Sequence, residues 1–218
     1  MLGVRPGTHT IEECPQYQLA VHNSKLASRK ALRPLGVIKG RDGCVLAAGT
    51  WAVRDVPADG DCLFHSLGKE IACKFPHHAA LPAEPLQGSS WRAFLMEFVV
   101  ESSDVVMDDL TVAEWLAIVC GQTVEEYVSA MHVVRGRETW GGMIDASFLA
   151  SAWSRRIGQD VAAILLAKTA DGAMQALAWL GPRTAAETIC AAWQGAHWVR
   201  GRLRPAATEV VRAWAVAP

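Results

Sequence analysis

The sequence lacks any apolar run long enough to cross a membrane, and its first residues contain no unbroken apolar segment. A transmembrane helix needs about 20 predominantly apolar residues. A signal peptide needs an apolar core behind a basic start. No internal repeat or low-complexity segment is visible either. We therefore expect a protein that makes no membrane contact and works in the cytosol, either alone or as a domain excised from a larger protein.

A clustered excess of basic residues is also missing. The 218 residues contain 21 Lys and Arg against 22 Asp and Glu, for a formal net charge of −1. The densest basic stretch runs from Lys25 to Arg33, and we interpret it as a solvated helix face. Proteins that bind nucleic acid usually concentrate positive charge on one face. The composition therefore argues against a nucleic-acid partner.

The six cysteines form no Cys-x-x-Cys pair and have no regular spacing. No cysteine and histidine cluster has the spacing of a zinc site. A chain of this length does not need disulfides to fold, so we expect free thiols in a reducing compartment. We expect no metal and no other cofactor.

The chain fits one domain with an appendage, and its 51% hydrophobic content can form a sizeable core. Residues 1–44 are irregular, with one expected helix near 24–33, and we interpret them as an N-terminal extension. The hydrophobic pattern becomes regular in 45–205, which we expect to be the catalytic domain. Residues 206–218 are expected to form a C-terminal tail or edge element. Nothing indicates oligomerisation, so we expect a monomer.

Hydrophobic periodicity predicts helices in the first part of this domain and strands in the last third. Capping boxes open two helices at Thr111 and Thr123, and Gly158 ends another. Ser90 is expected to cap the helix that carries Trp91. Short strands are expected at 44–48 and 51–56, helices at 62–71, 91–99, 111–120, 123–134 and 145–157, and strands at 160–167, 174–180, 188–193 and 197–203. This order predicts an α+β fold.

A cysteine stands at the start of the first of these helices, behind an acidic turn, in Asp59-Gly60-Asp61-Cys62. The unpaired N–H groups of a helix N-terminus favour a thiolate. Gly60 permits a turn that exposes main-chain amides, so Gly60, Asp61 and Cys62 can form an oxyanion hole. A lone cysteine is usually a small buried hydrophobe, but a core cysteine does not need this turn.

A histidine far downstream, His197, opens the last predicted strand directly after a tight turn. It lies 135 positions after Cys62, and bringing the two together would create an activated nucleophile. His65 is a rival base because it lies three residues after Cys62 on the same helix. Its side chain would point along the helix flank, so we rank it below His197.

Four stretches resemble the ovarian-tumour (OTU) family of cysteine proteases, which are deubiquitinases. They are Asp59–Phe64, Glu125–Met131, Thr139–Gly142 with the helix and strand that follow, and His197–Val199. They occur in the family's order and span about 45–205. The resemblance implies a papain-type α+β fold with a small, mostly antiparallel sheet packed by helices.

The resemblance also implies roles for individual residues. Cys62 would be the nucleophile and His197 the general base and then acid. Asp59 would shape the oxyanion turn and, in some members, orient the histidine. Trp198 would border a narrow channel for the Gly-Gly tail of ubiquitin or a ubiquitin-like modifier, although packing in the sheet is an alternative role for its ring. Viral and bacterial members would work in the host cytosol.

The sequence departs from the family pattern two residues after the histidine, where many members have Asp or Asn. Val199 stands there and cannot accept a hydrogen bond. Either Asp59, a residue of another strand or no third residue orients His197. The favoured hypothesis is a thiol isopeptidase that removes ubiquitin or a related modifier. The alternatives are a viral protease that processes its own polyprotein, with secondary deubiquitinase activity, and an inactive enzyme that only binds ubiquitin.

Overall fold

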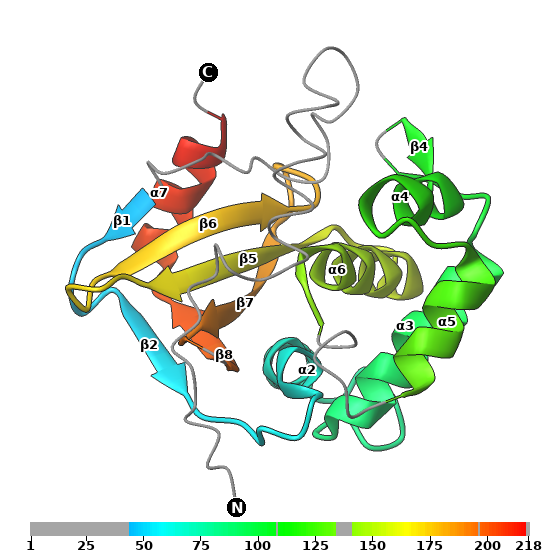
Figure 1. Cartoon of the computed structure of the whole chain (residues 1–218). Helices are drawn as coiled ribbons and strands as arrows, with labels where there is room; N and C mark the ends of the chain where they lie inside the picture. Colours follow the sequence, from blue (N-terminus) through cyan, green and yellow to red (C-terminus); the bar gives the residue numbers. More distant parts are fainter. Residues whose placement is uncertain (1–43, 108, 134–140, 196, 217–218) are drawn as a thin grey trace, which may run out of the picture.

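A curled six-stranded sheet forms the centre of the computed structural model, with helices on both of its faces (Figure 1). The structure describes residues 44–107, 109–133, 141–195 and 197–216. The strand order is β1-β6-β5-β7-β8-β2, and all pairs are antiparallel except β5 with β7. The strands are β1 (Cys44–Leu46), β2 (Trp51–Arg54), β5 (Val161–Lys168), β6 (Met174–Leu180), β7 (Glu187–Trp193) and β8 (Trp198–Leu203). The predicted α+β class is confirmed.

The apolar run of β5 explains why the sheet is covered on both faces. Successive side chains of a strand point to opposite faces, so a strand buried on both sides has no polar alternation. Ala163 and Leu165 join the core on the helix-rich face, and Ile164 and Leu166 join the core beneath α7 (Pro205–Val216). All four side chains are at most 2% exposed.

Three helices position the candidate nucleophile, of which the first and last in the chain pack on the helix-rich face of the sheet and the middle one packs on both of them. They are α2 (Cys62–Lys74), α3 (Gly88–Glu101) and α6 (Met143–Ile157). The shorter α4 (Val112–Val119) and α5 (Val124–His132) lie further from the sheet, beyond α3 and α6 (Figure 1). Within the described residues, no helix has the length and apolar character needed to cross a membrane.

Local signals in the sequence set several helix ends. Both predicted capping boxes are present, with the Thr111 and Thr123 hydroxyls accepting from the third amide of their helices. Gly158 ends α6 in the left-handed conformation at φ 67°, as predicted. The predicted cap at Ser90 is wrong, because α3 begins at Gly88 behind Gln87. The Gly88 N–H, at the start of this helix, is bound by His65 Nδ1 of α2, so a tertiary contact and not Ser90 satisfies it.

Two elements were not anticipated. The small hairpin of β3 (Val106–Met107) and β4 (Leu110–Thr111) precedes α4. Helix α7 occupies the region where a tail or edge element was expected, and Val211 and Ala215 pack against the sheet. The predicted helix near 24–33 lies outside the described residues.

Candidate active site

Cys62 is the first residue of α2, and its side chain is 5% exposed. Burial raises the pKa of the Cys62 thiol. The main-chain N–H groups of Trp198 and Leu63 reach the sulfur and act in the opposite direction, but burial outweighs them. The thiol is therefore not stabilised as a thiolate by the helix N-terminus alone. A base is needed to remove its proton.

The Trp198 N–H that reaches the Cys62 sulfur belongs to the first residue of β8, and His197 directly precedes that residue in the chain. The His197 ring is held by the segment that follows β2. Its Nε2 lies 3.0 Å from the Val56 carbonyl oxygen and 3.3 Å from Asp55 Oδ1. Both neighbours are acceptors, so Nε2 carries the proton and donates it. Nδ1 is then the nitrogen that can accept a proton.

The pairing of β2 with β8 explains this arrangement. The two strands are antiparallel, with Arg54 opposite Arg200, so the residues after β2 run beside the residues before β8. Asp55 and Val56 therefore meet His197 although 141 positions separate Val56 from it. The contacts of the His197 ring thus come from the segment after β2, and not from Asp59. Val199 instead packs in the core beneath α7.

Asp59 does not contact His197 in the way the family pattern suggested. One carboxylate oxygen lies 2.9 Å from His65 Nε2 and the other accepts the Asp61 N–H at 3.0 Å. The hydrogen bond to His65 helps to hold the pKa of Asp59 below its ordinary value, against a desolvation that raises it. Asp59 thus shapes the turn before Cys62, as expected, but orienting His197 is left to Asp55 and Val56.

The rival base His65 uses both of its ring nitrogens for hydrogen bonds that hold the same turn. Its Nδ1 accepts the Gly88 N–H at 3.0 Å, which leaves the proton on Nε2 for the bond to Asp59. Both ring nitrogens are therefore occupied, and the side chain is only 4% exposed. His65 links α2, α3 and the turn, and its geometry does not suit proton transfer to a substrate.

The three residues predicted to supply oxyanion donors have different roles in the structure. The Asp61 amide is used by the Asp59 carboxylate, because an aspartate side chain readily accepts from the amide two residues on. The prediction that Asp61 contributes a donor is therefore not supported by this geometry. The Cys62 amide points to its own sulfur, so it remains a candidate donor for a developing oxyanion. Gly60 has φ 92°, which glycine adopts without strain, so it allows the turn.

Trp198 contributes its main chain to the site and its side chain to the core. The indole N–H donates to the Gly141 carbonyl at 3.0 Å, and the ring lies 5.2 Å from that of Trp193. The residue is 5% exposed. This favours the packing role for the ring. Gly141 and Gly142 of the predicted turn are described, and Trp140 lies outside the described residues.

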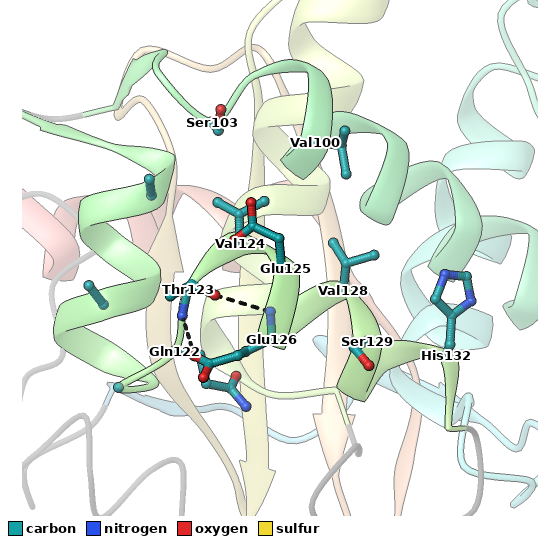
Figure 2. Close-up of a pocket in the computed structure, with 13 residues that line it drawn as sticks. Val100, Ser103, Gln122, Thr123, Val124, Glu125, Glu126, Val128, Ser129 and His132 are labelled. Atoms are coloured by element: carbon teal, nitrogen blue, oxygen red, sulfur yellow. Dashed lines mark hydrogen bonds between the residues drawn. The ribbon is translucent and has the colours of Figure 1, made fainter.

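A separate groove of about 1020 Å³ lies among α3, α4 and α5 and contains none of the predicted site residues. Figure 2 shows Val100 of α3 and Val124 and Val128 of α5 along it, with Glu125 beside them. The whole stretch 93–134 has eight carboxylates and no Lys or Arg. The groove is therefore an acidic and partly apolar surface, distinct from the Cys62 site.

Among the residues that the structure describes, no group of three or more His, Cys, Asp or Glu side chains is arranged to hold a metal ion. The five described cysteines are all free thiols: Cys44, Cys62, Cys73, Cys120 and Cys190.

The Asp55 carboxylate is expected to matter only modestly for activity. Its side chain is 88% exposed and the Val56 carbonyl holds the same ring nitrogen at a shorter distance. Exposed ion pairs contribute little because solvent screens them. We expect Asp55→Asn to lower kcat/KM by less than about tenfold, measured by steady-state hydrolysis of a fluorogenic substrate. Asp160→Asn, at another exposed aspartate, is the control. A loss near a thousandfold would show that the carboxylate is an essential third member.

Comparison with known proteins shows similarity in structure but not in sequence. No model of a protein family and no curated protein matches the chain. The viral OTU domain protease from Taggert virus is similar in structure, with a TM-score of 0.52 and 14% identity over 78% of this chain and 93% of that chain. The Hazara virus OTU bound to ubiquitin has a TM-score of 0.48 and 18% identity, over 74% of this chain and 87% of its own. An OTU deubiquitinase from Wolbachia pipientis bound to ubiquitin has a TM-score of 0.41 and 12% identity, over 71% and 97%. The chain therefore has the α+β, papain-type fold of the OTU domain proteases.

Proposed function

We propose that this protein is a cysteine protease that releases ubiquitin or a ubiquitin-like modifier from conjugates. One observation carries the proposal. The sulfur of Cys62 is reached by the Trp198 amide, directly beside a histidine whose Nε2 is held by Val56. A cysteine that only fills space in the core would not need an oriented imidazole beside the strand residue that contacts it. A nucleophile does need one.

The chemistry follows from the arrangement. His197 Nδ1 takes the thiol proton while the Cys62 sulfur attacks the carbonyl carbon of the modifier's terminal glycine. The negative charge moves to the carbonyl oxygen, where the Cys62 amide donates to it. The imidazolium then gives its proton to the leaving lysine amine as the C–N bond breaks. Water attacks the resulting thioester and gives one proton to His197, which passes it to the departing Cys62 thiolate as the C–S bond breaks. The modifier leaves as a carboxylic acid, which loses its proton to solvent.

Ubiquitin is proposed as the modifier because two of the similar proteins are described as bound to ubiquitin. The resemblance of Asp59–Phe64 and His197–Val199 to the OTU motifs supports the same substrate class. The extended Gly-Gly tail of ubiquitin carries no bulky side chain, which suits attack by a cysteine that is only 5% exposed.

A ubiquitin derivative with an electrophile at its C-terminus tests this function. We expect one covalent adduct on the wild-type protein, seen in the intact mass spectrum and mapped to Cys62 by peptide analysis. Cys62→Ala should form no adduct. Cys73→Ala, which removes an exposed cysteine of the same helix, should label like the wild type.

Two results would contradict the proposal. A folded wild-type protein that forms no adduct with ubiquitin or with ubiquitin-like modifiers would exclude the proposed isopeptidase. An adduct that persists in Cys62→Ala would assign the nucleophile to another residue.

A further inference from the structure

The Arg92 guanidinium is buried between the turn before α2 and the end of α5, and the residue is 2% exposed. Its Nε donates to Asp61 Oδ1 and its Nη2 donates to the Gly60 carbonyl at 2.9 Å. Its Nη1 lies 3.4 Å from both the carbonyl oxygen and the sulfur of Met131, at the end of α5. The guanidinium carbon lies 4.7 Å from the centre of the Phe64 ring. One side chain therefore contacts the two residues before Cys62 and two helices.

The contact with Arg92 changes the role of Asp61 at the N-terminus of α2. Asp61 is the N-cap, and an aspartate at that position normally accepts from the second or third amide of its helix. Here the side chain makes no such bond. Its carboxylate is instead paired with Arg92, and Asp61 is 4% exposed. The Asp61 side chain therefore does not accept a hydrogen bond from the first main-chain N–H groups of α2.

The first amide of α2, that of Cys62, is the one that the proposed reaction uses, and the Leu63 and Phe64 amides that a capping aspartate would bind follow it directly. A carboxylate bonded to the Leu63 or Phe64 amide would place a second negative charge beside the oxyanion that develops at the Cys62 amide. The Arg92 fork removes this obstacle because it binds the carboxylate and the Gly60 carbonyl at once. A lysine could not make both contacts in this geometry, since its ammonium lacks the planar fork.

We propose that Arg92 is a positioning residue that keeps the Asp61 carboxylate away from the first turn of α2, so that its charge does not oppose the oxyanion at the Cys62 amide. This inference rests on the proposed function. A buried ion pair can also be merely structural. The chain offers a matched control for that role in Arg200, which pairs with the buried Glu70 in the later part of α2.

The test compares Arg92→Lys and Arg92→Gln with Arg200→Gln in the full chain. Substrate turnover is measured with a fluorogenic ubiquitin C-terminal amide, and oxyanion binding with a ubiquitin C-terminal aldehyde, whose adduct with the thiol has an oxyanion. We expect both Arg92 variants to lower kcat by about 10- to 100-fold, with KM changed less than about threefold. Aldehyde affinity should fall by a similar factor. Arg200→Gln should lower the melting temperature but leave kcat within about threefold.

A second variant separates positioning from simple loss of structure. Arg92→Gln with Asp61→Ala lacks the carboxylate that Arg92 restrains, so it should recover most of the kcat lost in Arg92→Gln. A merely structural role predicts that the second substitution gives no recovery. Either that result or an unchanged kcat in folded Arg92→Lys would overturn the inference. The double variant also buries no unpaired charge, so it remains informative if Arg92→Gln does not fold.

Failure of the proposed function can be distinguished from failure of the inference about Arg92. If wild type turns over no ubiquitin substrate, alkylation of Cys62 by iodoacetamide still tests the placement of the Asp61 charge. The rate should fall several-fold in Arg92→Gln, because a carboxylate beside the sulfur disfavours the thiolate, and should recover when Asp61→Ala is added. Equal alkylation rates in all three proteins would overturn the inference by themselves.

Discussion

Replacing His197 with glutamine is expected to lower kcat/KM by about 10²–10⁴-fold, the usual contribution of a general base. Glutamine can still donate an N–H to the Val56 carbonyl that now accepts from His197 Nε2. The substitution therefore removes the proton acceptor while keeping the contact that orients the side chain. Hydrolysis of a fluorogenic ubiquitin amide measures the loss, and circular dichroism checks the fold.

The pH dependence of the remaining activity gives an independent check. Burial raises the pKa of the Cys62 thiol, so without a base only the small thiolate fraction can react. That fraction grows about tenfold per pH unit below the thiol pKa. The residual rate of His197→Gln should therefore climb steeply from neutral to alkaline pH. A variant with nearly full activity and a flat profile at neutral pH would show that His197 is not the base.

Parts of the fold and of the candidate site could be predicted, because the sequence signals for them are local. The Asp59–Cys62 turn, the two capping boxes and Gly158 each depend on residues within four positions of one another. The strand β6 matches its prediction, because a short apolar run bounded by turn residues describes it fully. Such features are determined before any tertiary contact forms.

The partners of His197 and Asp61 could not be predicted, because tertiary pairing creates them. Asp55 contacts His197 only because β2 pairs with β8, and no pattern in residues 51–56 predicts the register of that pairing. Arg92 stands between Trp91 and Phe94 in an apolar helix, where a sequence pattern indicates only a polar position. Its burial becomes understandable once the carboxylate of Asp61 and the end of α5 are known to lie beside it.

Close packing of α2 against α3 is the other long-range condition on which the site depends. A methyl group added at Gly68 would lie 2.0 Å from Trp91 Cδ1 and 2.2 Å from Trp91 Nε1. Trp91 cannot move aside easily, because it is fully buried and its indole N–H donates to the Pro85 carbonyl at 2.8 Å. Its ring also contacts Trp153 at 5.6 Å.

We therefore expect Gly68→Ala to reduce the free energy of unfolding by about 3 kcal/mol, the upper part of the range for overpacked cores. Urea denaturation of the wild type and the variant measures this difference. Gly121→Ala is an informative comparison: it adds strain at φ 66° but meets nothing within 4 Å, so it should cost about 1 kcal/mol. Equal losses in the two variants would mean that backbone conformation, and not the contact with Trp91, limits position 68.

A compensating substitution completes the argument. Trp91→Leu alone removes a large buried ring and is expected to destabilise the protein by about 3–5 kcal/mol. In Gly68→Ala with Trp91→Leu, the added methyl group would enter the space left by the ring, so the combined loss should be clearly smaller than the sum of the single losses. Strict additivity would show that the two positions do not share one contact. Since this contact sets how closely α2 approaches α3, it also sets where Cys62 and His65 of α2 lie relative to the Gly88 amide of α3.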